Sequence, residues 1–339
     1  MGIITKLTTV QRIRSALVSL LITSVVFPGI YQPPLDIIWM KLRGISFYNW
    51  STFETIWTIL CYIIIEHRLT MVFLNRPAWR FVVKQQSQSV KATQSKPKGM
   101  RRPSRRIGEF LIYITPLLAM DLTMIKKFAG VPLADMLESG NYDIAAQIAA
   151  NSTEIFGPHR QTFLVPMLHN FSSSSPLQVF RALPKEAPSS RRVTMELITS
   201  FVIYDMMFFL FHLSLHTVRP LRLWHAPHHS HDVQLNPQIT NKLSIFERLG
   251  LVMLANFSLN IIGAHVLTRT LFVPLFVWLL VEIHCGMDLP WGYEKVLPSG
   301  WGGGARKHMR HHNVGNGGFE PFFCWWDGLW ESTMFQMPG

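Results

Sequence analysis

Charged residues are scarce in this sequence. Only 15% of its 339 residues are Asp, Glu, Lys or Arg, whereas 48% are hydrophobic. Soluble domains usually carry about 25% charged residues, so the deficit favours an integral membrane protein. The apolar stretches run through most of the chain, which predicts one continuous membrane-associated unit rather than separate soluble domains.

Acidic residues are missing from the segment 76–106, which contains ten Lys or Arg. A basic stretch between apolar segments is typical of a cytoplasmic loop that faces anionic lipid headgroups. The net charge of +12 is not accompanied by any nucleic-acid-binding motif. We therefore expect the basic residues to face a membrane and not to bind nucleic acid.

Cysteines are few and widely spaced. Cys61, Cys285 and Cys324 are odd in number, which excludes a disulfide framework and predicts no thiolate metal site. Internal repeats are also absent. The first apolar stretch, Ile13–Ile30, has no small-residue cleavage site after it, so we expect a retained membrane helix rather than a signal peptide.

Further apolar stretches predict more membrane helices. They are Phe53–Leu74, Phe110–Ile125, Met195–Leu213 and Phe246–Ile283. The last is long enough for a membrane hairpin, with a break near 263–270. Pro116 and Asp121 interrupt Phe110–Ile125, which indicates either a kinked span or a re-entrant segment.

Counting spans gives a topology. If the N-terminus and the basic segment are cytoplasmic and 110–125 crosses the membrane, residues 126–192 lie in the lumen. Two sequons for N-glycosylation, at Asn151 and Asn170, fall within that polar stretch. The remaining spans then return every dense histidine cluster to the cytoplasmic side.

Ten of the 14 histidines fall into four short stretches. They are His212 and His216; His225, His228, His229 and His231; His284; and His308, His311 and His312. Residues four apart share one face of a helix, so these spacings aim several imidazoles at a common point. Pro227 predicts that a helix begins near it, within the second cluster. One such pair would be unremarkable, but neither core packing nor solvation requires three regularly spaced groups.

The number of imidazoles indicates two metal ions, because eight or more nitrogen ligands exceed the four of a closed zinc site. Imidazole binds iron, copper, zinc and nickel, so ligand type leaves the metal open. The Glu-x-x-His pattern of soluble di-iron bundles is absent. Carboxylates are expected to support the ligands, although helix capping or interfacial solvation explains them equally well. The candidates are Asp205, Asp232, Glu282 and Asp288.

The three main clusters resemble those of the fatty acid hydroxylase/sterol desaturase superfamily. The run Glu282–Trp291 is similar to the family's acidic-x-His-Ser-Gly-Tyr-Asp-Phe-Pro-Trp segment, and Gly315-Asn316 and Trp325–Asp327 match residues that follow its last cluster. The resemblance covers about 195–330 and is greatest to the sterol C4-methyl oxidase and cholesterol 25-hydroxylase branches. Met287 and Leu289 stand where the family has Tyr and Phe, which alters the expected wall of the substrate site.

The resemblance implies an all-α integral membrane protein, in which a transmembrane helical stalk carries a cytosolic helical cap in the endoplasmic reticulum. The cap is implied to hold two iron ions that use O2 and electrons from NAD(P)H, delivered by cytochrome b5 or a similar donor. The implied reaction is hydroxylation, desaturation or successive oxidation of a lipid such as a sterol, a fatty acyl chain or a lipid-like secondary metabolite. The implied ligands are His212, His216, His225, His228, His229, His284, His308, His311 and His312. His231 lies outside the motif.

The resemblance also divides the chain into an N-terminal membrane region, 1–193, and a catalytic region, 194–339. Five tryptophans of the tail are expected to line substrate access or to form an interfacial belt. They are Trp291, Trp301, Trp325, Trp326 and Trp330. Arg306, Lys307 and Arg310 are expected to dock an acidic electron donor or lipid headgroups.

Other classes remain open. A metal-binding or transport protein would place histidines inside the spans near the midplane, whereas these cluster at span ends. A membrane zinc-dependent hydrolase would need only three ligands and an open position. A non-catalytic lipid-binding relative would have no reason to keep all clusters intact.

Overall fold

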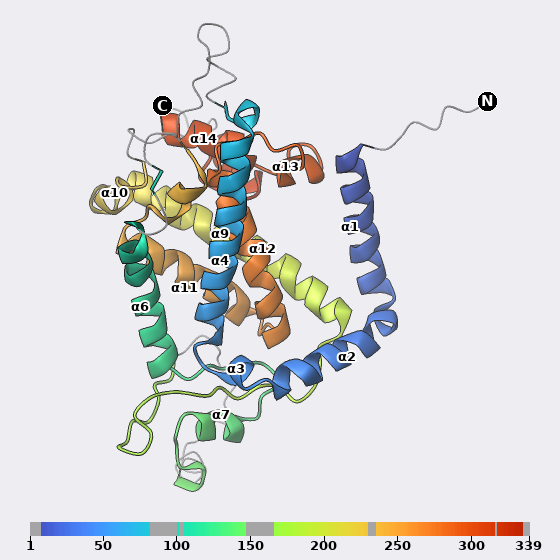
Figure 1. Cartoon of the computed structure of the whole chain (residues 1–339), viewed down its shortest axis with the longest axis vertical. Helices are drawn as coiled ribbons and strands as arrows, with labels where there is room; N and C mark the ends of the chain where they lie inside the picture. Colours follow the sequence, from blue (N-terminus) through green and yellow to red (C-terminus); the bar gives the residue numbers. More distant parts are fainter. Residues whose placement is uncertain are drawn as a thin grey trace, which may run out of the picture.

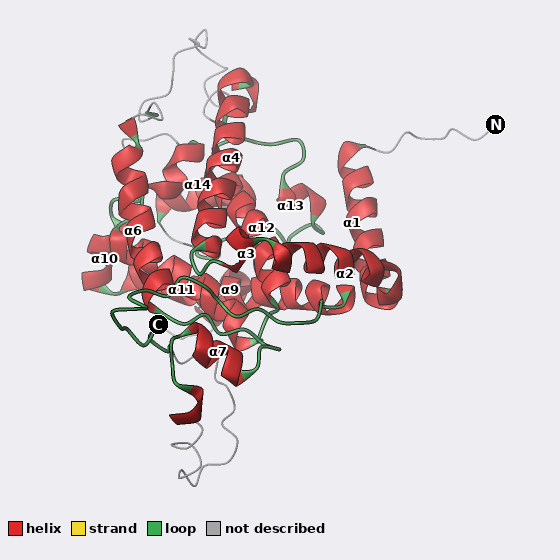
Figure 2. Ribbon diagram, turned by 60° about the horizontal axis from the view of Figure 1, so that its bottom comes forward, coloured by secondary structure: helices red, strands yellow, loops and turns green. Residues whose placement is uncertain are grey.

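The computed structural model describes residues 8–81, 100–101, 105–146, 166–229, 235–315 and 317–334. Helices and loops make up these residues and no named strand occurs among them, which confirms the expected all-α class (Figures 1 and 2). Four helices are long and apolar enough to cross a membrane. They are α1 (Thr9–Val26), α4 (Phe53–Asn75), α9 (Ser190–Thr217) and α12 (Val266–His284).

The centre of the molecule is a helical bundle. α4 packs along α12, and α9 crosses them obliquely in Figure 1. Two shorter helices, α6 (Ile107–Thr123) and α11 (Ile245–Ile261), complete the bundle beside α4 and α9. Most of α1 stands apart from these helices in Figure 1, but its end packs against the start of α9, where the hydroxyls of Ser24 and Thr194 lie 2.9 Å apart; α2 (Pro28–Gly44) follows it.

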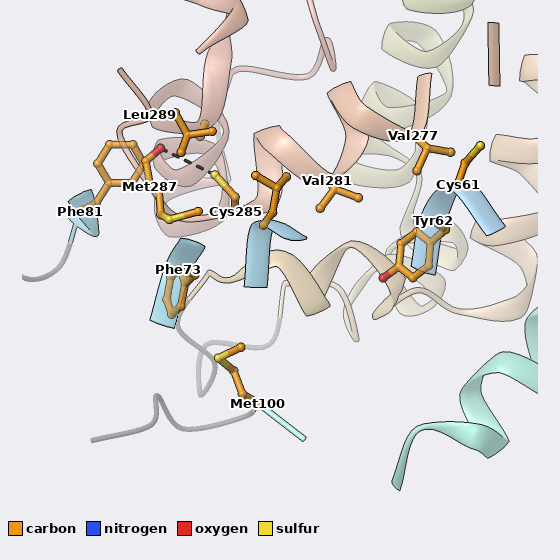
Figure 3. Packing of buried hydrophobic residues seen from close by; sticks show 12 residues of the cluster. Cys61, Tyr62, Phe73, Phe81, Met100, Val277, Val281, Cys285, Met287 and Leu289 are labelled. Atoms are coloured by element: carbon orange, nitrogen blue, oxygen red, sulfur yellow. Dashed lines mark hydrogen bonds between the residues drawn. The ribbon is translucent and has the colours of Figure 1, made fainter. Parts of the chain in front are cut away.

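The contact between α4 and α12 is apolar and fully packed. Phe73 on α4, Val281 on α12 and Cys285 have no exposed surface, and Leu69 is almost as buried. Figure 3 shows Cys285 and Met287 beside Phe81, which follows α4. The first half of the chain therefore supports the end of α12, where His284 lies.

The outer flanks of the long helices are apolar. Side chains such as Ile22, Ile64, Leu111 and Leu210 are about half exposed or more. A soluble fold would bury such residues, whereas a bilayer solvates them. The exposed apolar flanks therefore agree with the composition in identifying a membrane protein.

Two expected boundaries are wrong. The first helix ends at Val26 rather than Ile30, because Pro28 lacks an N–H and begins α2 instead. The break in the predicted hairpin is shorter than 263–270. Gly263 adopts a φ of 61°, and α12 already begins at Val266, with the side chain of His265 accepting from the Leu267 N–H.

Helix α6 runs through Pro116 as one continuous helix of 17 residues, so the chain is not broken within it. At 1.5 Å per residue it is about 25 Å long, somewhat less than the ~30 Å of a hydrocarbon core. Its status as a full membrane span remains a prediction.

The helix ends separate into two levels in Figure 1. The start of α1, the end of α4 and the short helices α13 (Tyr293–Val296) and α14 (Gly304–Val314) lie at one end, and α3 (Ser46–Asn49) and α7 (Leu133–Ser139) lie at the other. Arg14 ties α1 to this first level by donating to the carbonyl oxygens of residues 295–297 at 2.9–3.2 Å. We call the two levels the histidine end and the loop end.

Candidate metal centre

Helix α9 presents the first histidine pair. The hydroxyl of Ser189 caps its start, and the helix continues unbroken to Thr217. His212 and His216 are therefore one turn apart on the same face, as expected, with ring centroids 5.0 Å apart.

The second cluster lies in a turn rather than on a helix that starts near Pro227, so that expectation is wrong. α10 (Arg219–His225) ends at His225, because Pro227 has no N–H to continue the helix. The backbone N–H groups of His228 and His229 both donate to the His225 carbonyl, at 2.9 and 3.4 Å. This tight turn holds three imidazoles close together.

The remaining histidines lie on two helices. His284 is the last residue of α12, and α14 carries His308, His311 and His312 with the expected one-turn spacing. α14 ends at Val314 and is capped by Gly315, whose φ of 74° lets its N–H bond back to the His311 carbonyl at 2.7 Å.

All nine predicted ligands converge at the histidine end, in two groups. Within each group, one potential ligand atom per residue lies within 4.8 Å of all the others. The first group is His212, His216, His225, His229 and His311, and the second is His228, His284, His308 and His312.

The two groups share their polypeptide segments. His228 and His229 are consecutive in the sequence but belong to different groups, and the same is true of His311 and His312. The rings of His229 and His312 stack across the division at 4.5 Å. Each His-x-x-His-His motif thus contributes to both groups, so that the two sites adjoin.

Backbone carbonyls fix the tautomer of several rings. Nδ1 of His212, His284 and His311 lies 2.7–2.8 Å from the carbonyl oxygens of Phe319, Leu280 and Gly317. A carbonyl only accepts, so each Nδ1 carries the proton and each Nε2 presents a bare lone pair. The imidazoles are therefore prepared to bind a cation through Nε2.

The pair His228 and His284 gives the clearest evidence for a cation site. Nδ1 of His228 lies 3.3 Å from the Lys242 carbonyl, so both rings have their proton on Nδ1. Their Nε2 atoms nevertheless lie only 3.2 Å apart. Two lone pairs at this distance repel each other, and a shared cation removes the repulsion.

Further evidence for a bound cation comes from His216 in the first group. Nε2 of His216 is buried and has no hydrogen-bond partner among the described residues. A buried unpaired nitrogen costs free energy unless something binds it. The donor set is entirely imidazole, which suits iron, copper, zinc or nickel. The residues present thus fit a transition-metal pair.

Burial keeps the imidazoles uncharged. It lowers the pKa of His225 to about 2, with neighbouring imidazoles adding to the effect. Burial likewise lowers the pKa values of His228, His308 and His312 well below the usual value. The rings are therefore neutral at physiological pH, which is the form that binds metal.

Sequence reasoning missed Glu247. Its Oε1 lies 2.8 Å from Nδ1 of His225, and the carboxyl is buried near the start of α11. Glu247 is 22 residues from its partner, and its local sequence looks like ordinary helix capping, because Ser244 caps α11 at its backbone N–H. Only the tertiary fold identifies this carboxylate.

The carboxylates chosen from sequence contact other partners. Asp205 accepts from the N–H groups of Phe322 and Phe323 at 2.9 and 3.3 Å. Glu282 accepts from the Trp278 indole at 2.5 Å and from the Tyr293 N–H at 2.7 Å. These contacts fix the loops around the site.

Asp288 pairs with Lys295 at 2.5 Å and with Arg306 at 3.2 Å. A supporting role of Asp205, Glu282 and Asp288 for the ligands stays a prediction. Asp232 and His231 lie outside the described residues.

Other predicted features are aromatic pairs and a lysine near the histidines. Trp301 packs edge-on against Trp325, and Trp291 against Trp79, at 5.5 and 5.3 Å. Lys307 is directed inward and pairs with Asp327 at 2.6 Å. Docking of an electron donor at Arg306, Lys307 and Arg310 stays a prediction.

Of the two sequon asparagines, Asn170 lies within the described residues. Asn170 is exposed, and its side-chain amide donates to the Asn141 carbonyl at 2.9 Å. Asn151 lies outside the described residues. Glycosylation of either asparagine stays a prediction.

Comparison with known proteins identifies the region that contains these histidines. Residues 197–332 match the fatty acid hydroxylase family model. A zebrafish (Danio rerio) cholesterol 25-hydroxylase-like protein is 35% identical over 152 residues, which are 44% of this chain and 60% of that protein. Human cholesterol 25-hydroxylase is 34% identical over 43% of this chain and 54% of its own length.

A plant protein is also similar. Methylsterol monooxygenase 2-2 of Arabidopsis thaliana is 30% identical over 44% of this chain and 58% of its own length. The chain therefore spans between half and two thirds of each of these three relatives. No solved structure matches it. The superfamily and the two branches suggested by the histidine motifs are confirmed for this region.

Proposed function

We propose, on the premise that residues 197–332 form a fatty acid hydroxylase region, that this protein is a membrane-bound non-haem di-iron oxygenase acting on a lipid. The observation that carries the proposal is the convergence of nine histidines into two adjoining groups with bare Nε2 atoms. Residues 194–339 would be the catalytic region, and 1–193 would supply the remaining membrane helices.

The first group would bind one iron ion through five imidazoles and the second group the other through four. When bound, the irons supply the redox chemistry with O2 that breaks an unactivated C–H bond, which side-chain acids and bases cannot do. Imidazole ligands alone do not select iron, so the choice of metal rests on the family and on this chemical need.

The protein's own residues would prepare the site. The carbonyls of Phe319, Leu280 and Gly317 hold protons on Nδ1 and keep Nε2 directed at the metals. His212 and His311 are at most 2% exposed, whereas His216, His229 and His312 are partly exposed, so the chain would shield most of the centre from bulk water. The helices beneath would let a lipid enter from the bilayer.

The proposed reaction is hydroxylation of a lipid, with electrons from NAD(P)H delivered by cytochrome b5 or a similar donor. Two groups of relatives, named as cholesterol 25-hydroxylases and methylsterol monooxygenases, support a sterol-like substrate. Successive oxidation or desaturation would use the same centre and differ in how the substrate is positioned.

The proposed location is the endoplasmic reticulum membrane, with the histidine end in the cytosol. The basic segment begins and ends at this level, because Phe81 donates to the Gly286 carbonyl at 3.1 Å and Arg101 donates to Gln238 at 2.9 Å. Basic segments favour the cytosolic side. Arg310, which is exposed on α14, is a candidate contact for an acidic electron donor.

A histidine-to-alanine series tests the function. We expect His228→Ala and His311→Ala to abolish the oxidised lipid, because each removes one ligand from a different group. His67→Ala is the matched control, since His67 is exposed on α4 and belongs to neither group. The measurement compares lipid extracts by mass for gain of one oxygen or loss of two hydrogens.

Metal analysis separates the competing classes. About two irons per purified wild-type chain would support the oxygenase, whereas one zinc ion in an iron-supplemented preparation would favour a zinc-dependent hydrolase. Normal product from either ligand variant would refute the assignment of these histidines.

A further inference from the structure

A cavity lies between the starts of α6 and α11 and the short helix η3 (Pro237–Asn241). Its volume is about 340 Å³, which is within the range of ~300–1,000 Å³ that small-molecule sites occupy. None of the nine histidines lines it, so it is separate from the candidate metal centre. Its charged lining residues are mostly basic. They are Arg101, Arg106, Lys242, Arg248 and Glu109.

Two of these arginines already have carboxylate partners. Arg106 is buried and pairs with Glu66 at 3.1 Å and with Glu109 at 3.3 Å. Arg101 reaches Glu109 at 2.8 Å, and its side chain is 61% exposed, which places it at the rim. Glu66 and Glu109 therefore balance Arg101 and Arg106 and leave no negative charge for Arg248.

Arg248 has no carboxylate partner among the described residues. It lies on the first turn of α11 and is 7% exposed, and the neighbouring Glu247 is directed at His225 instead. Nη2 of Arg248 donates to the carbonyl oxygens of Asn241 and Leu243 at 3.0 and 3.4 Å. These acceptors are neutral. Because a largely buried cation without a counter-charge costs free energy, an anion bound in the cavity would stabilise this residue.

Part of the Arg248 guanidinium is open to a ligand. Its Nε is enclosed and has no hydrogen-bond partner among the described residues. Its Nη1 also has no hydrogen bond among these residues, but it is not one of the enclosed atoms. Because Arg248 lines the cavity, Nη1 is the donor that a ligand there would meet. The fork of N–H groups on a guanidinium fits the oxygens of a phosphate.

Exposed apolar side chains border the same cavity. Ile112 on α6 and Ile245 on α11 both line it, and each is about half exposed. Ile107 and Phe246, on the same two helices, are exposed as well. A free anion gains nothing from such side chains, whereas the acyl chains of a phospholipid cover them. Basic pockets between membrane helices are a known form of binding site for anionic lipid headgroups.

We propose that this cavity binds the phosphate group of an anionic phospholipid from the surrounding leaflet. Arg248 would be the principal contact, and Arg101 would contact the headgroup from the rim. The acyl chains would lie against the exposed apolar side chains of α6 and α11. The proposal concerns binding and does not depend on the reaction that the histidines perform. It gives the chain a lipid ligand that is not its substrate.

Lipid analogues test the ligand on wild-type protein. Full-length protein in an uncharged detergent is titrated with dioctanoyl phosphatidic acid, dioctanoylglycerol or inorganic phosphate, and the rise in the unfolding midpoint reports binding. Because only the first probe combines phosphate with acyl chains, we expect it to bind about tenfold more tightly than either of the others. Equal binding of dioctanoylglycerol would overturn the phosphate contact. Equal binding of inorganic phosphate would assign the cavity to a free anion and overturn the lipid.

Substitutions test the residues. Arg248→Gln keeps N–H donors but removes the charge, so it should weaken binding of dioctanoyl phosphatidic acid about tenfold. Arg101→Gln removes an exposed charge at the rim, so it should leave folding intact and weaken binding about threefold. Arg310→Gln is the matched control, because Arg310 is an exposed cation on α14 that does not line the cavity.

Two outcomes of this series would refute the site. The first is unchanged affinity in Arg101→Gln or in well-folded Arg248→Gln. The second is a loss in Arg310→Gln as large as that in Arg248→Gln, because overall surface charge would then explain the binding. The wild-type titration and Arg101→Gln decide the proposal even if Arg248→Gln folds poorly.

Discussion

At the residue scale, the site depends on contacts that aim each imidazole. For His225 the contact is a carboxylate, because its Nδ1 lies 2.8 Å from Oε1 of Glu247. With a cation at Nε2, an ionised Glu247 accepts from Nδ1–H and makes the ring a better ligand.

Replacement of Glu247 should therefore weaken the metal centre without unfolding the protein. We expect Glu247→Ala to lower metal affinity about 10–100-fold, and Glu247→Gln to fall between it and wild type, because the amide oxygen still accepts. Chelator titration of metal-loaded protein measures this. Glu138→Ala, at an exposed position on α7, is the control, and wild-type retention in Glu247→Ala would argue against the role.

Gly286 fixes the backbone just after His284. Its φ is 66°, and a Cβ there would lie 2.2 Å from the Leu235 carbonyl oxygen. Because a backbone atom cannot easily move aside, we expect Gly286→Ala to cost more than about 1 kcal/mol and to lower metal content.

The control is Gly44→Ala, at the end of α2, where a Cβ meets nothing within 4 Å. Thermal unfolding in detergent and metal content should distinguish the two variants. A loss of stability in Gly44→Ala as large as that in Gly286→Ala would show that the clash is not the cause.

At the element scale, helix periodicity explains what the sequence predicts well. His212 and His216, like His308 and His312, are one turn apart on single helices, so local spacing was sufficient to align them. The second cluster was harder, because Pro227 closes a turn rather than opening a helix. Its imidazoles still converge, because a tight turn also brings side chains close together.

Contacts between elements could not be predicted from spacing. Glu54 at the start of α4 meets Arg181 and Arg269, which lie 127 and 215 residues away. Both arginines are at most 5% exposed. The pattern of apolar runs identifies the helices, but the register between them is set by such buried polar contacts.

Removing the shared carboxylate should destabilise the bundle. We expect Glu54→Gln to cost about 3–5 kcal/mol, because it leaves two buried guanidinium groups without a counter-charge. The midpoint of thermal unfolding should fall well below wild type. Asp36→Asn, at an exposed position on α2, should have little effect, and equal midpoints for both variants would contradict the assigned role of the network.

At the scale of the whole molecule, the histidine end and the loop end are on opposite sides of the long helices (Figure 1). The topology inferred from span counting requires the same division. It requires α6 to cross the membrane despite its 17 residues. A bilayer thins around a short helix at modest cost, so the length does not forbid it.

Two exposed serines test this topology. Ser299 follows α13 at the histidine end, and Ser173 lies in the loop after Asn170 at the loop end. In a background with Cys324→Ser, which leaves only two buried cysteines, Ser299→Cys and Ser173→Cys each introduce one accessible thiol. In sealed right-side-out microsomes, an impermeant thiol reagent should label Ser299→Cys and not Ser173→Cys until detergent is added. Labelling of both thiols in intact vesicles would place the two ends on one side of the membrane, and α6 would then not be a span.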